Sequence, residues 1–161
     1  MPDRDWLEGI YRRHRRPLFL TAWNVLRCPS LAEDAVHSAF VRLAELSVPP
    51  GEPKLYAFRA VRNAAIDLAR ARCRRHEEQI SVEENGPQVA TQPAEDEALS
   101  AVHIALSHLD ERAREVVELH LHGRLTFQEI AMLCNEPLQT VASRYRRALE
   151  KLRQLLEVYH E

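Results

Sequence analysis

The sequence of 161 residues has only four glycines, few runs of β-branched residues and no long apolar run. Sparse glycine and the lack of β-branched runs favour an all-α chain. No apolar run approaches the roughly 20 residues that a membrane-spanning helix needs, and the start MPDRDWLEG lacks the apolar core of a signal peptide. A hydrophobic content of 45% is still enough for packed helical cores. We therefore expect an all-α protein without membrane insertion.

Cysteine and net charge are both low. Cys28, Cys73 and Cys134 are scattered, odd in number and free of any CxxC pattern, which is typical of reduced thiols in a cytoplasmic protein rather than of a disulfide framework. A net charge of −2 does not by itself indicate a nucleic-acid partner. The charges are strongly segregated along the chain, so their distribution is more informative than their sum.

The sequence has no glycine-rich phosphate loop, nucleophile–base pair or complete set of metal ligands. His120 and His122 form a possible metal half-site, but two histidines at this spacing on a helix face different sides, and no cysteine or carboxylate cluster completes the site. We favour surface or packed histidines and predict no enzyme activity, no metal and no cofactor. A metal hydrolase is the alternative, which metal analysis of the purified protein would test.

The most informative stretch runs from Gly123 to Arg153. Thr126 and Glu129 have the spacing of a capping box ahead of an apolar pair, which predicts a short helix from Phe127 to about Cys134. Asn135 tolerates the left-handed backbone of a helix end, and Pro137 suits the first turn of a second helix. Two helices joined by so tight a turn predict a helix-turn-helix.

The second of these helices has two faces. Its predicted buried stripe has spacings of three and four residues and comprises Leu138, Val141, Tyr145, Ala148, Leu152 and Leu155. The opposite side carries hydroxyls and basic side chains, namely Thr140, Ser143, Arg144, Arg147 and Lys151. Such a face near a helix N-terminus can enter a DNA major groove. A solvated, arginine-rich surface is the alternative, and we favour DNA binding.

Two further helices are expected before the helix-turn-helix. The first has the stripe Leu99, Val102, Leu106 and Leu109. Asp110 is expected to cap the second, which ends at Gly123 and turns inward Ala113, Val116, Val117, His120 and Leu121. Residues 96–161 are therefore predicted to form a four-helix domain whose DNA-reading helix comes last.

The N-terminal part predicts a helix from Asp5 to Leu26 that Pro17 bends or restarts. Ser30 and Glu33 have capping-box spacing and are expected to open the next helix. The stripe of that helix comprises Ala32, Ala35, Val36, Ala39, Phe40, Leu43 and Leu46. Val41 and part of Phe40 stand exposed beside charges, which suggests a protein-binding face, with a plain surface helix as the alternative.

A proline-rich connector, Ser47 to Pro53, is expected to be a surface loop. It leads to a helix from Leu55 to about Arg72 whose inward residues are Phe58, Val61, Ala65, Leu68 and Ala69. From Arg59 to Arg75 there are six arginines and one acid, the charge pattern expected beside a phosphate backbone. Residues 1–75 are predicted to form the first domain.

The next stretch, His76 to Glu97, has seven acids, two prolines and neither lysine nor arginine. This composition predicts a flexible acidic linker over residues 76–95.

Three segments, in this order, resemble a bacterial RNA polymerase sigma factor of the extracytoplasmic-function group in the sigma-seventy family. They are AEDAVHSAFVRLAEL, YAFRAVRNAAIDLARARCRR and LSHLDERAREVVELHLHGRLTFQEIAMLCNEPLQTVASRYRRALEKLR. The resemblance implies a region 2-like and a region 4-like domain, with core RNA polymerase, promoter DNA and an anti-sigma factor as partners. A stand-alone helix-turn-helix regulator is the alternative, and it would bind a promoter duplex without polymerase.

The resemblance also implies site residues. Polymerase contacts are expected from Asp34, His37, Phe40 and Val41. Contacts with the minus-ten element are expected from Arg59, Arg62, Asn63 and Arg70. Contacts with the minus-thirty-five element are expected from Thr140, Ser143, Arg144, Arg146 and Arg147. His37 and Ser38 depart from the family pattern in the polymerase-facing helix, and Ala142 stands where a basic DNA-contacting residue is common.

Overall fold

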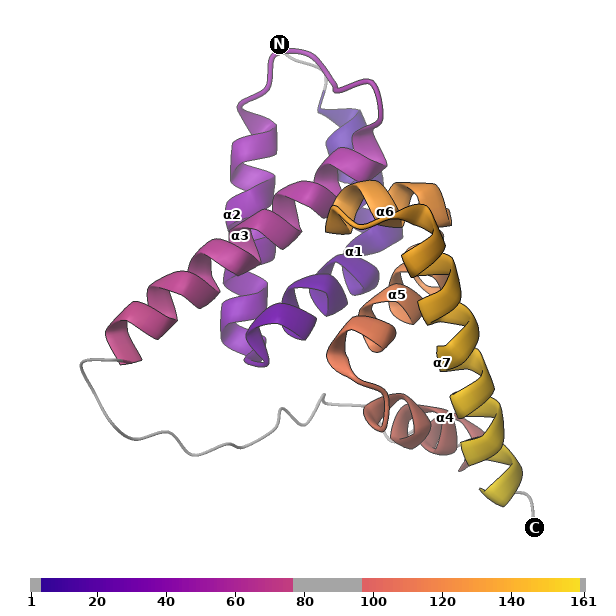
Figure 1. Cartoon of the computed structure of the whole chain (residues 1–161). Coiled ribbons are helices and arrows are strands. Elements are labelled where there is room, and N and C mark those ends of the chain that lie inside the picture. Colours follow the sequence, from indigo (N-terminus) through magenta and orange to yellow (C-terminus); the bar gives the residue numbers. More distant parts are fainter. Residues whose placement is uncertain (1–3, 77–96, 160–161) are drawn as a thin grey trace. The chain divides into compact units, whose positions relative to one another are not determined.

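The computed structural model describes residues 4–76 and 97–159, and in these ranges the chain has seven helices and no strand (Figure 1). The chain divides into two compact helical units between Pro87 and Gln88. The predicted linker lies outside the described residues apart from His76, which ends a helix. The predicted fold, two small all-α domains with a helix-turn-helix at the end of the second, is confirmed. None of the described helices combines the length and the apolar character that a membrane span requires.

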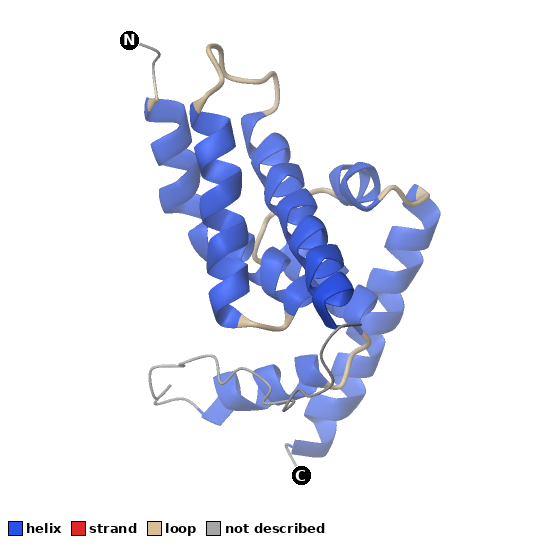
Figure 2. Ribbon diagram, turned by 90° about the vertical axis from the view of Figure 1, so that its left-hand side faces the viewer, coloured by secondary structure: helices blue, strands red, loops and turns tan. Residues whose placement is uncertain are grey.

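The first unit consists of three helices, α1 (Asp5–Leu26), α2 (Pro29–Ala44) and α3 (Pro53–His76). Each packs against the other two, and Figure 2 shows them side by side. Leu18, Leu43, Phe58 and Val61 lie fully buried between them because each belongs to the inward stripe of its helix. The ring of Phe58 also meets the imidazole of His14, at 6.0 Å between centroids.

Helix α1 passes through Pro17 as one continuous element, which excludes the restart but not the bend that the sequence predicts there. The hydroxyl of Thr21 donates to the carbonyl of Pro17 at 2.9 Å. Proline removes one backbone donor from a helix interior. Leu18 and Ala22, both fully buried just after the proline, keep this stretch packed in the core.

Helix α2 begins at Pro29, not at a Ser30 cap, so the predicted capping box is wrong. Cys28 is the N-cap residue, in extended conformation, and its side chain makes no capping hydrogen bond. Proline at the first helical position has its φ already suited to a helix, so the helix starts one residue before Ser30. Arg27, with φ 53°, turns the chain, and its N–H donates to the carbonyl of Trp23 at 2.8 Å.

Helix α3 is longer than predicted at both ends. Its first residue is Pro53, which the sequence placed in the connecting loop, because proline is tolerated in the first turn, where its missing donor has no partner to lose. Its inward positions Phe58, Val61 and Ala65 are buried as expected, whereas Leu68 and Ala69 are half-buried.

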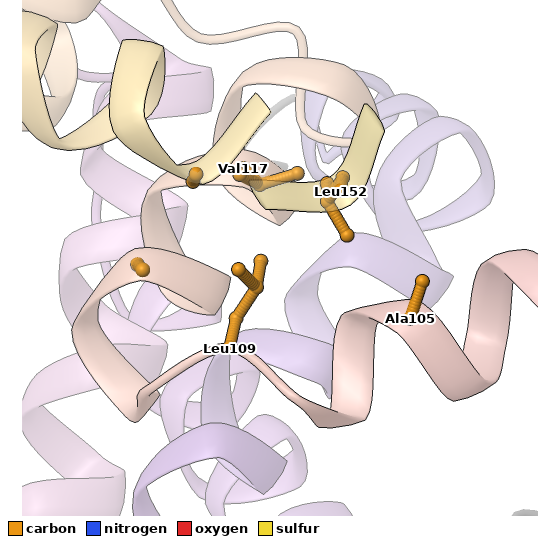
Figure 3. Packing of buried hydrophobic residues seen from close by; sticks show 6 residues of the cluster. Ala105, Leu109, Val117 and Leu152 are labelled. Carbon is orange, nitrogen blue, oxygen red and sulfur yellow. The ribbon is translucent and has the colours of Figure 1, made fainter. Parts of the chain in front are cut away.

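The second unit consists of α4 (Glu97–Ser107), α5 (Glu111–Leu121), α6 (Phe127–Cys134) and α7 (Leu138–Tyr159). Helix α7 packs against each of the other three. Figure 3 shows the core between α4, α5 and α7, which includes Ala105, Leu109, Val117 and Leu152. This core holds α7 in place and leaves its other side to solvent.

Three apolar residues predicted to face inward are exposed instead: Val102, Leu121 and Leu138. Leu121 is the last residue of α5 and Leu138 the first of α7, so both lie at an end of their helix. Ala105 of α4 is buried, and so is Leu109 just after the helix, whereas Val102 lies on a side of α4 that faces away from the core.

Candidate nucleic-acid interface

The helix-turn-helix begins with the predicted capping box, at the start of α6. The hydroxyl of Thr126 accepts the N–H of Glu129 at 3.1 Å, and the carboxylate of Glu129 accepts the N–H of Thr126 at 3.1 Å. Two backbone donors at the start of α6 are thereby paired. The predicted bounds of this helix, Phe127 to Cys134, are confirmed.

Asn135 ends α6 in the left-handed conformation that the sequence predicts, with φ 54° and ψ 47°. Its N–H and that of Glu136 both donate to the carbonyl of Ala131. Pro137 lies just before α7 rather than within its first turn, and its carbonyl accepts the N–H of Val141 at 3.2 Å. The turn is therefore closed by backbone bonds on both sides, and it fixes where α7 starts.

Aromatic rings hold α5, α6 and α7 together. His120 stacks on Phe127 with centroids 4.5 Å apart, and Tyr145 lies 4.8 Å from His120 and 5.0 Å from Phe127. The Nδ1 atom of His120 is 2.8 Å from the carbonyl oxygen of Leu125. The interpretation of His120 as a packed side chain is confirmed. Across the described ranges, no group of three or more potential metal ligands is placed to hold a metal.

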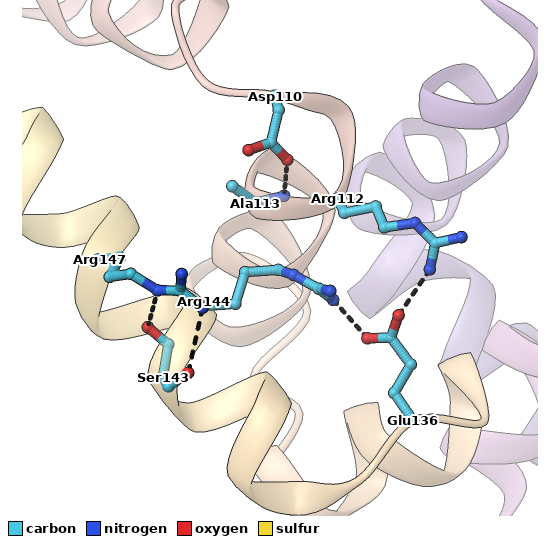
Figure 4. A network of polar contacts seen from close by, with 7 residues as sticks. All are labelled: Asp110, Arg112, Ala113, Glu136, Ser143, Arg144 and Arg147. Atoms are coloured by element: carbon cyan, nitrogen blue, oxygen red, sulfur yellow. Dashed lines mark hydrogen bonds and ion pairs between the residues drawn. The ribbon is translucent and has the colours of Figure 1, made fainter.

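Two side chains fix the start of α5 and its approach to α7. A carboxylate oxygen of Asp110 accepts the N–H of Ala113 at 2.9 Å, which confirms the predicted cap (Figure 4). The ammonium group of Lys151, on α7, donates to the carbonyl of His108 at 3.0 Å. Lys151 is exposed as predicted, and it links α7 to the turn that follows α4.

The polar face of α7 lies opposite the core. Thr140 and Ser143 are half-buried, whereas Arg146 and Arg147 are exposed. The guanidinium of Arg147 contacts only its own helix in Figure 4, with Nη2 3.3 Å from Oγ of Ser143 and Nε 3.4 Å from the Ser143 carbonyl. These bonds are long and exposed, so they leave Arg147 able to meet another partner.

Arg144 has a different environment, because its guanidinium forms an ion pair with Glu136 in the turn. The other carboxylate oxygen of Glu136 accepts from Nη1 of Arg112, on α5, at 2.6 Å. One carboxylate therefore connects α5, the turn and α7 (Figure 4). Sequence reasoning missed Glu136 and Arg112 because 24 residues separate them and neither belongs to a helix-start motif.

The two arginines keep the Glu136 carboxylate charged. Burial alone would raise the pKa of Glu136. Arg144 and Arg112 each lower it through a hydrogen bond and through their positive charge, and together they hold the pKa of Glu136 below its usual value. The carboxylate thus carries its negative charge next to the proposed DNA-facing side of α7.

In the first unit, α2 presents Asp34, His37 and Val41 on its exposed side. They lie three and four residues apart, so they share one face of the helix. Phe40 is half-buried, since its ring packs edge-on against Tyr11 of α1 at 5.2 Å between centroids. The predicted protein-binding residues thus form one surface, part of which also belongs to the packing of α1 on α2.

The predicted minus-ten residues are spread along α3. Asn63 and Arg70 are exposed, whereas Arg59 and Arg62 are half-buried. Nη1 of Arg72 donates to the carbonyl of Leu26 at 3.2 Å, which ties α3 to the end of α1. Basic side chains therefore lie along much of the helix, and Arg72 is partly engaged within the fold.

The sequences of both units match models of one protein family. The sigma-70 region 2 model matches residues 10–75, and the sigma-70 region 4 model matches residues 105–154. This chain belongs to the sigma-70 family. The match to region 4 contains the whole turn and the polar face of α7, and the match to region 2 contains α2 and almost all of α3.

No curated protein sequence matches this sigma factor. Among solved structures, it is similar in fold to the sigma factor RpoE from Bartonella quintana, solved in complex with the anti-sigma factor NepR. That match has a TM-score of 0.70 and 21% identity, and it covers 96% of this chain and 98% of the other. This likeness shows that the two chains share a fold.

Members of the sigma-70 family are DNA-binding transcription initiation factors that act with core RNA polymerase, and they are not enzymes. The prediction that this chain is not an enzyme follows from its membership.

Proposed function

We propose that this sigma factor directs core RNA polymerase to promoters by recognising both a minus-thirty-five and a minus-ten element and by helping to melt the DNA. The observation that carries this proposal is the rigid helix-turn-helix, in which a capping box, a left-handed Asn135 and an aromatic cluster fix α7 with its arginine-bearing face outward. A reading helix must be held at a fixed angle to its scaffold if base contacts are to be specific.

The second unit reads the minus-thirty-five element with the polar face of α7. Thr140, Ser143, Arg146 and Arg147 are its proposed contact residues, whereas Arg144, which the sequence also predicts as a contact, is ion-paired with Glu136. Arginine bonds guanine through two donors, and hydroxyls reach base edges or phosphate. The exposure of Arg146 and Arg147 supports this role, because neither has to leave a buried site to reach DNA.

The first unit acts on the minus-ten element. The loop that joins α2 to α3 captures an unstacked base of the non-template strand, and Arg59, Arg62, Asn63 and Arg70 hold the backbone of that strand. The exposure of Val48 in this loop and of Asn63 and Arg70 on α3 supports the proposal.

Docking on polymerase is the proposed role of α2, through Asp34, His37, Phe40 and Val41. Val41 is a large apolar residue that is 48% exposed between polar neighbours, a pattern that a protein partner would cover. The chain acts in the cytoplasm, where polymerase and promoter DNA are found. An anti-sigma factor is a further proposed partner, supported by the fold shared with a sigma factor solved in such a complex.

Transcription in vitro tests the proposal. Core polymerase with the full chain is incubated with a library of promoters randomised at both elements, and the transcripts are sequenced. We expect transcription from a subset that shares one sequence in each element, and none from core polymerase alone. A chain that binds its own duplex tightly without polymerase, and adds nothing to transcription, would instead be a stand-alone helix-turn-helix regulator.

A further inference from the structure

The carboxylate of Glu136 has both of its oxygens occupied by arginines of different helices. Arg144 of α7 bonds one oxygen, and Arg112 of α5 bonds the other. The side chains of Glu136 and Arg144 are only 15% and 21% exposed, whereas that of Arg112 is 65% exposed. Arg144 is therefore the more enclosed of the two arginines, although it belongs to the face proposed to read DNA.

Figure 4 shows the guanidinium groups of α7 in two arrangements. That of Arg144 extends to the turn and to Glu136, whereas that of Arg147 lies back over Ser143 on its own helix. Arg147 is exposed, and within the described residues its hydrogen bonds are the long ones to Ser143, at 3.3 and 3.4 Å. The two arginines are thus not equivalent donors for DNA.

We propose that Glu136 is a specificity-determining residue that withholds Arg144 from DNA and so leaves Arg147 as the principal arginine for base reading. This inference rests on the proposed function, because it assigns roles within the face proposed to read the minus-thirty-five element. It adds a residue in the turn that makes no DNA contact itself and yet decides which arginine does.

The energetic reason is competition between anions. A DNA phosphate that bonds Nη1 of Arg144 has to replace the carboxylate of Glu136, which is already charged, partly desolvated and hydrogen-bonded. Displacement would leave an enclosed carboxylate with Arg112 alone, and a buried charge that loses a partner is costly. Arg147 needs to give up only weak contacts with Ser143, so it meets the DNA at lower cost.

A second reason is electrostatic. A carboxylate close to the DNA-facing side repels phosphate, so non-specific attraction at this point of α7 is reduced while attraction at Arg146 and Arg147 remains. Replacing the carboxylate with an amide of the same shape should therefore strengthen binding to all sequences alike and weaken discrimination between them.

Salt dependence of promoter binding provides the test, because each phosphate contact made by a basic side chain contributes about −0.9 to the slope of log K against log[salt]. The holoenzyme, formed from core polymerase and the full chain, is titrated with a preferred promoter duplex and with a duplex scrambled in the minus-thirty-five element. With the wild-type Glu136, Arg144→Ala is expected to leave the slope and the sequence preference unchanged. Arg147→Ala is expected to lower affinity for the preferred duplex about fivefold or more and to relax preference at one base pair.

The key variant is Glu136→Gln, which keeps the side-chain shape and removes its charge. We expect it to bind both duplexes more tightly, with the slope steeper by about 0.9, and we expect Arg144→Ala in that background to return the slope to the wild-type value. Glu150→Gln is the matched control, because Glu150 is an exposed acid of α7 outside this network and its loss changes the net charge equally. It is expected to change the slope much less.

The inference is overturned if Arg144→Ala makes the salt slope shallower by the same amount in the wild-type protein as in the Glu136→Gln background. Arg144 would then reach DNA despite Glu136. If Glu136→Gln does not fold, the two single variants decide the matter. The inference is then refuted if Arg144→Ala lowers affinity for the preferred duplex as much as Arg147→Ala does. A failure of the proposed function gives a different result. In that case neither arginine variant, nor scrambling of the duplex, would change binding by the wild-type holoenzyme.

Discussion

Phe40 of α2 and Tyr11 of α1 meet edge to face, with ring centroids 5.2 Å apart and an angle of 78° between the rings. The surface proposed to dock on polymerase thus shares a side chain with the packing of the first unit. A loss of polymerase binding in a Phe40 variant has two possible causes, and the exposed neighbours Asp34 and Val41 separate them.

We expect Asp34→Arg and Val41→Asp to weaken binding to core polymerase at least tenfold without changing the thermal unfolding of the chain, because both side chains are exposed. Phe40→Ala is expected to weaken binding and also to lower the free energy of unfolding by about 1 kcal/mol or more, since it removes an aromatic pair together with half-buried surface. Pull-down with core polymerase and calorimetry measure the two effects. Asp67→Arg, an exposed charge reversal on α3, is the control, and equal loss of binding in that variant would contradict a site on α2.

The capping box of α6 supplies a prediction about stability. Thr126→Ala removes the side-chain acceptor for the N–H of Glu129 and is expected to destabilise the second unit by about 1 kcal/mol, within a range of roughly 0.5–2 kcal/mol. Gln128→Ala changes an exposed residue of the same helix and is expected to stay within about 0.5 kcal/mol of the wild type. Urea unfolding followed by circular dichroism compares them. Equal stability of the two variants would mean that the cap does not stabilise α6.

Glu136 supplies a prediction about pH. Its pKa in the folded protein lies below the usual value of 4.5, so on acidification the unfolded chain takes up the proton first. The stabilisation from the charged carboxylate is therefore complete above the unfolded pKa and is lost as the pH falls through the folded pKa. The difference in free energy of unfolding between the wild type and Glu136→Gln should be largest near neutral pH and shrink below about pH 4.5. A difference in unfolding free energy that stays constant from pH 7 to pH 3 would contradict the charge-based origin of this contact.

A fourth prediction concerns promoter opening. Arg70→Ala and Asn63→Ala, at exposed positions of α3, are expected to lower the fraction of open complexes several-fold while leaving minus-thirty-five discrimination intact. A fluorescent base analogue in the minus-ten element reports the opening. Arg74→Ala lies on the same helix beyond the proposed contacts and is the matched control. On a template with a preformed bubble, we expect the defect of Asn63→Ala and Arg70→Ala to diminish, because the DNA no longer has to be melted.

Local interactions made much of this protein predictable. The bounds of α6, the left-handed Asn135 and the cap at Asp110 each depend on atoms within about five residues, so their side-chain chemistry is visible in the sequence. The same reasoning was wrong at Ser30, where the capping-box spacing is present but Pro29 starts the helix first. Three segments that resemble one family, in the same order, also predicted the family and its two-domain helical fold.

Tertiary packing decided which stripe residues are buried and which distant side chains meet, and a local sequence pattern cannot predict either. Val102, Leu121 and Leu138 fit helical stripes, but only the positions and lengths of the neighbouring helices determine that they stay exposed. The meeting of Phe40 with Tyr11, and of Glu136 with Arg112, joins residues 24 or more apart, and no periodicity relates them. The sequence by itself determined which faces are basic, apolar or capped, because these properties belong to neighbouring residues. Only the folded chain decided that Arg144 faces a carboxylate and Arg147 faces solvent, because that depends on where α5 and the turn place their charges beside α7.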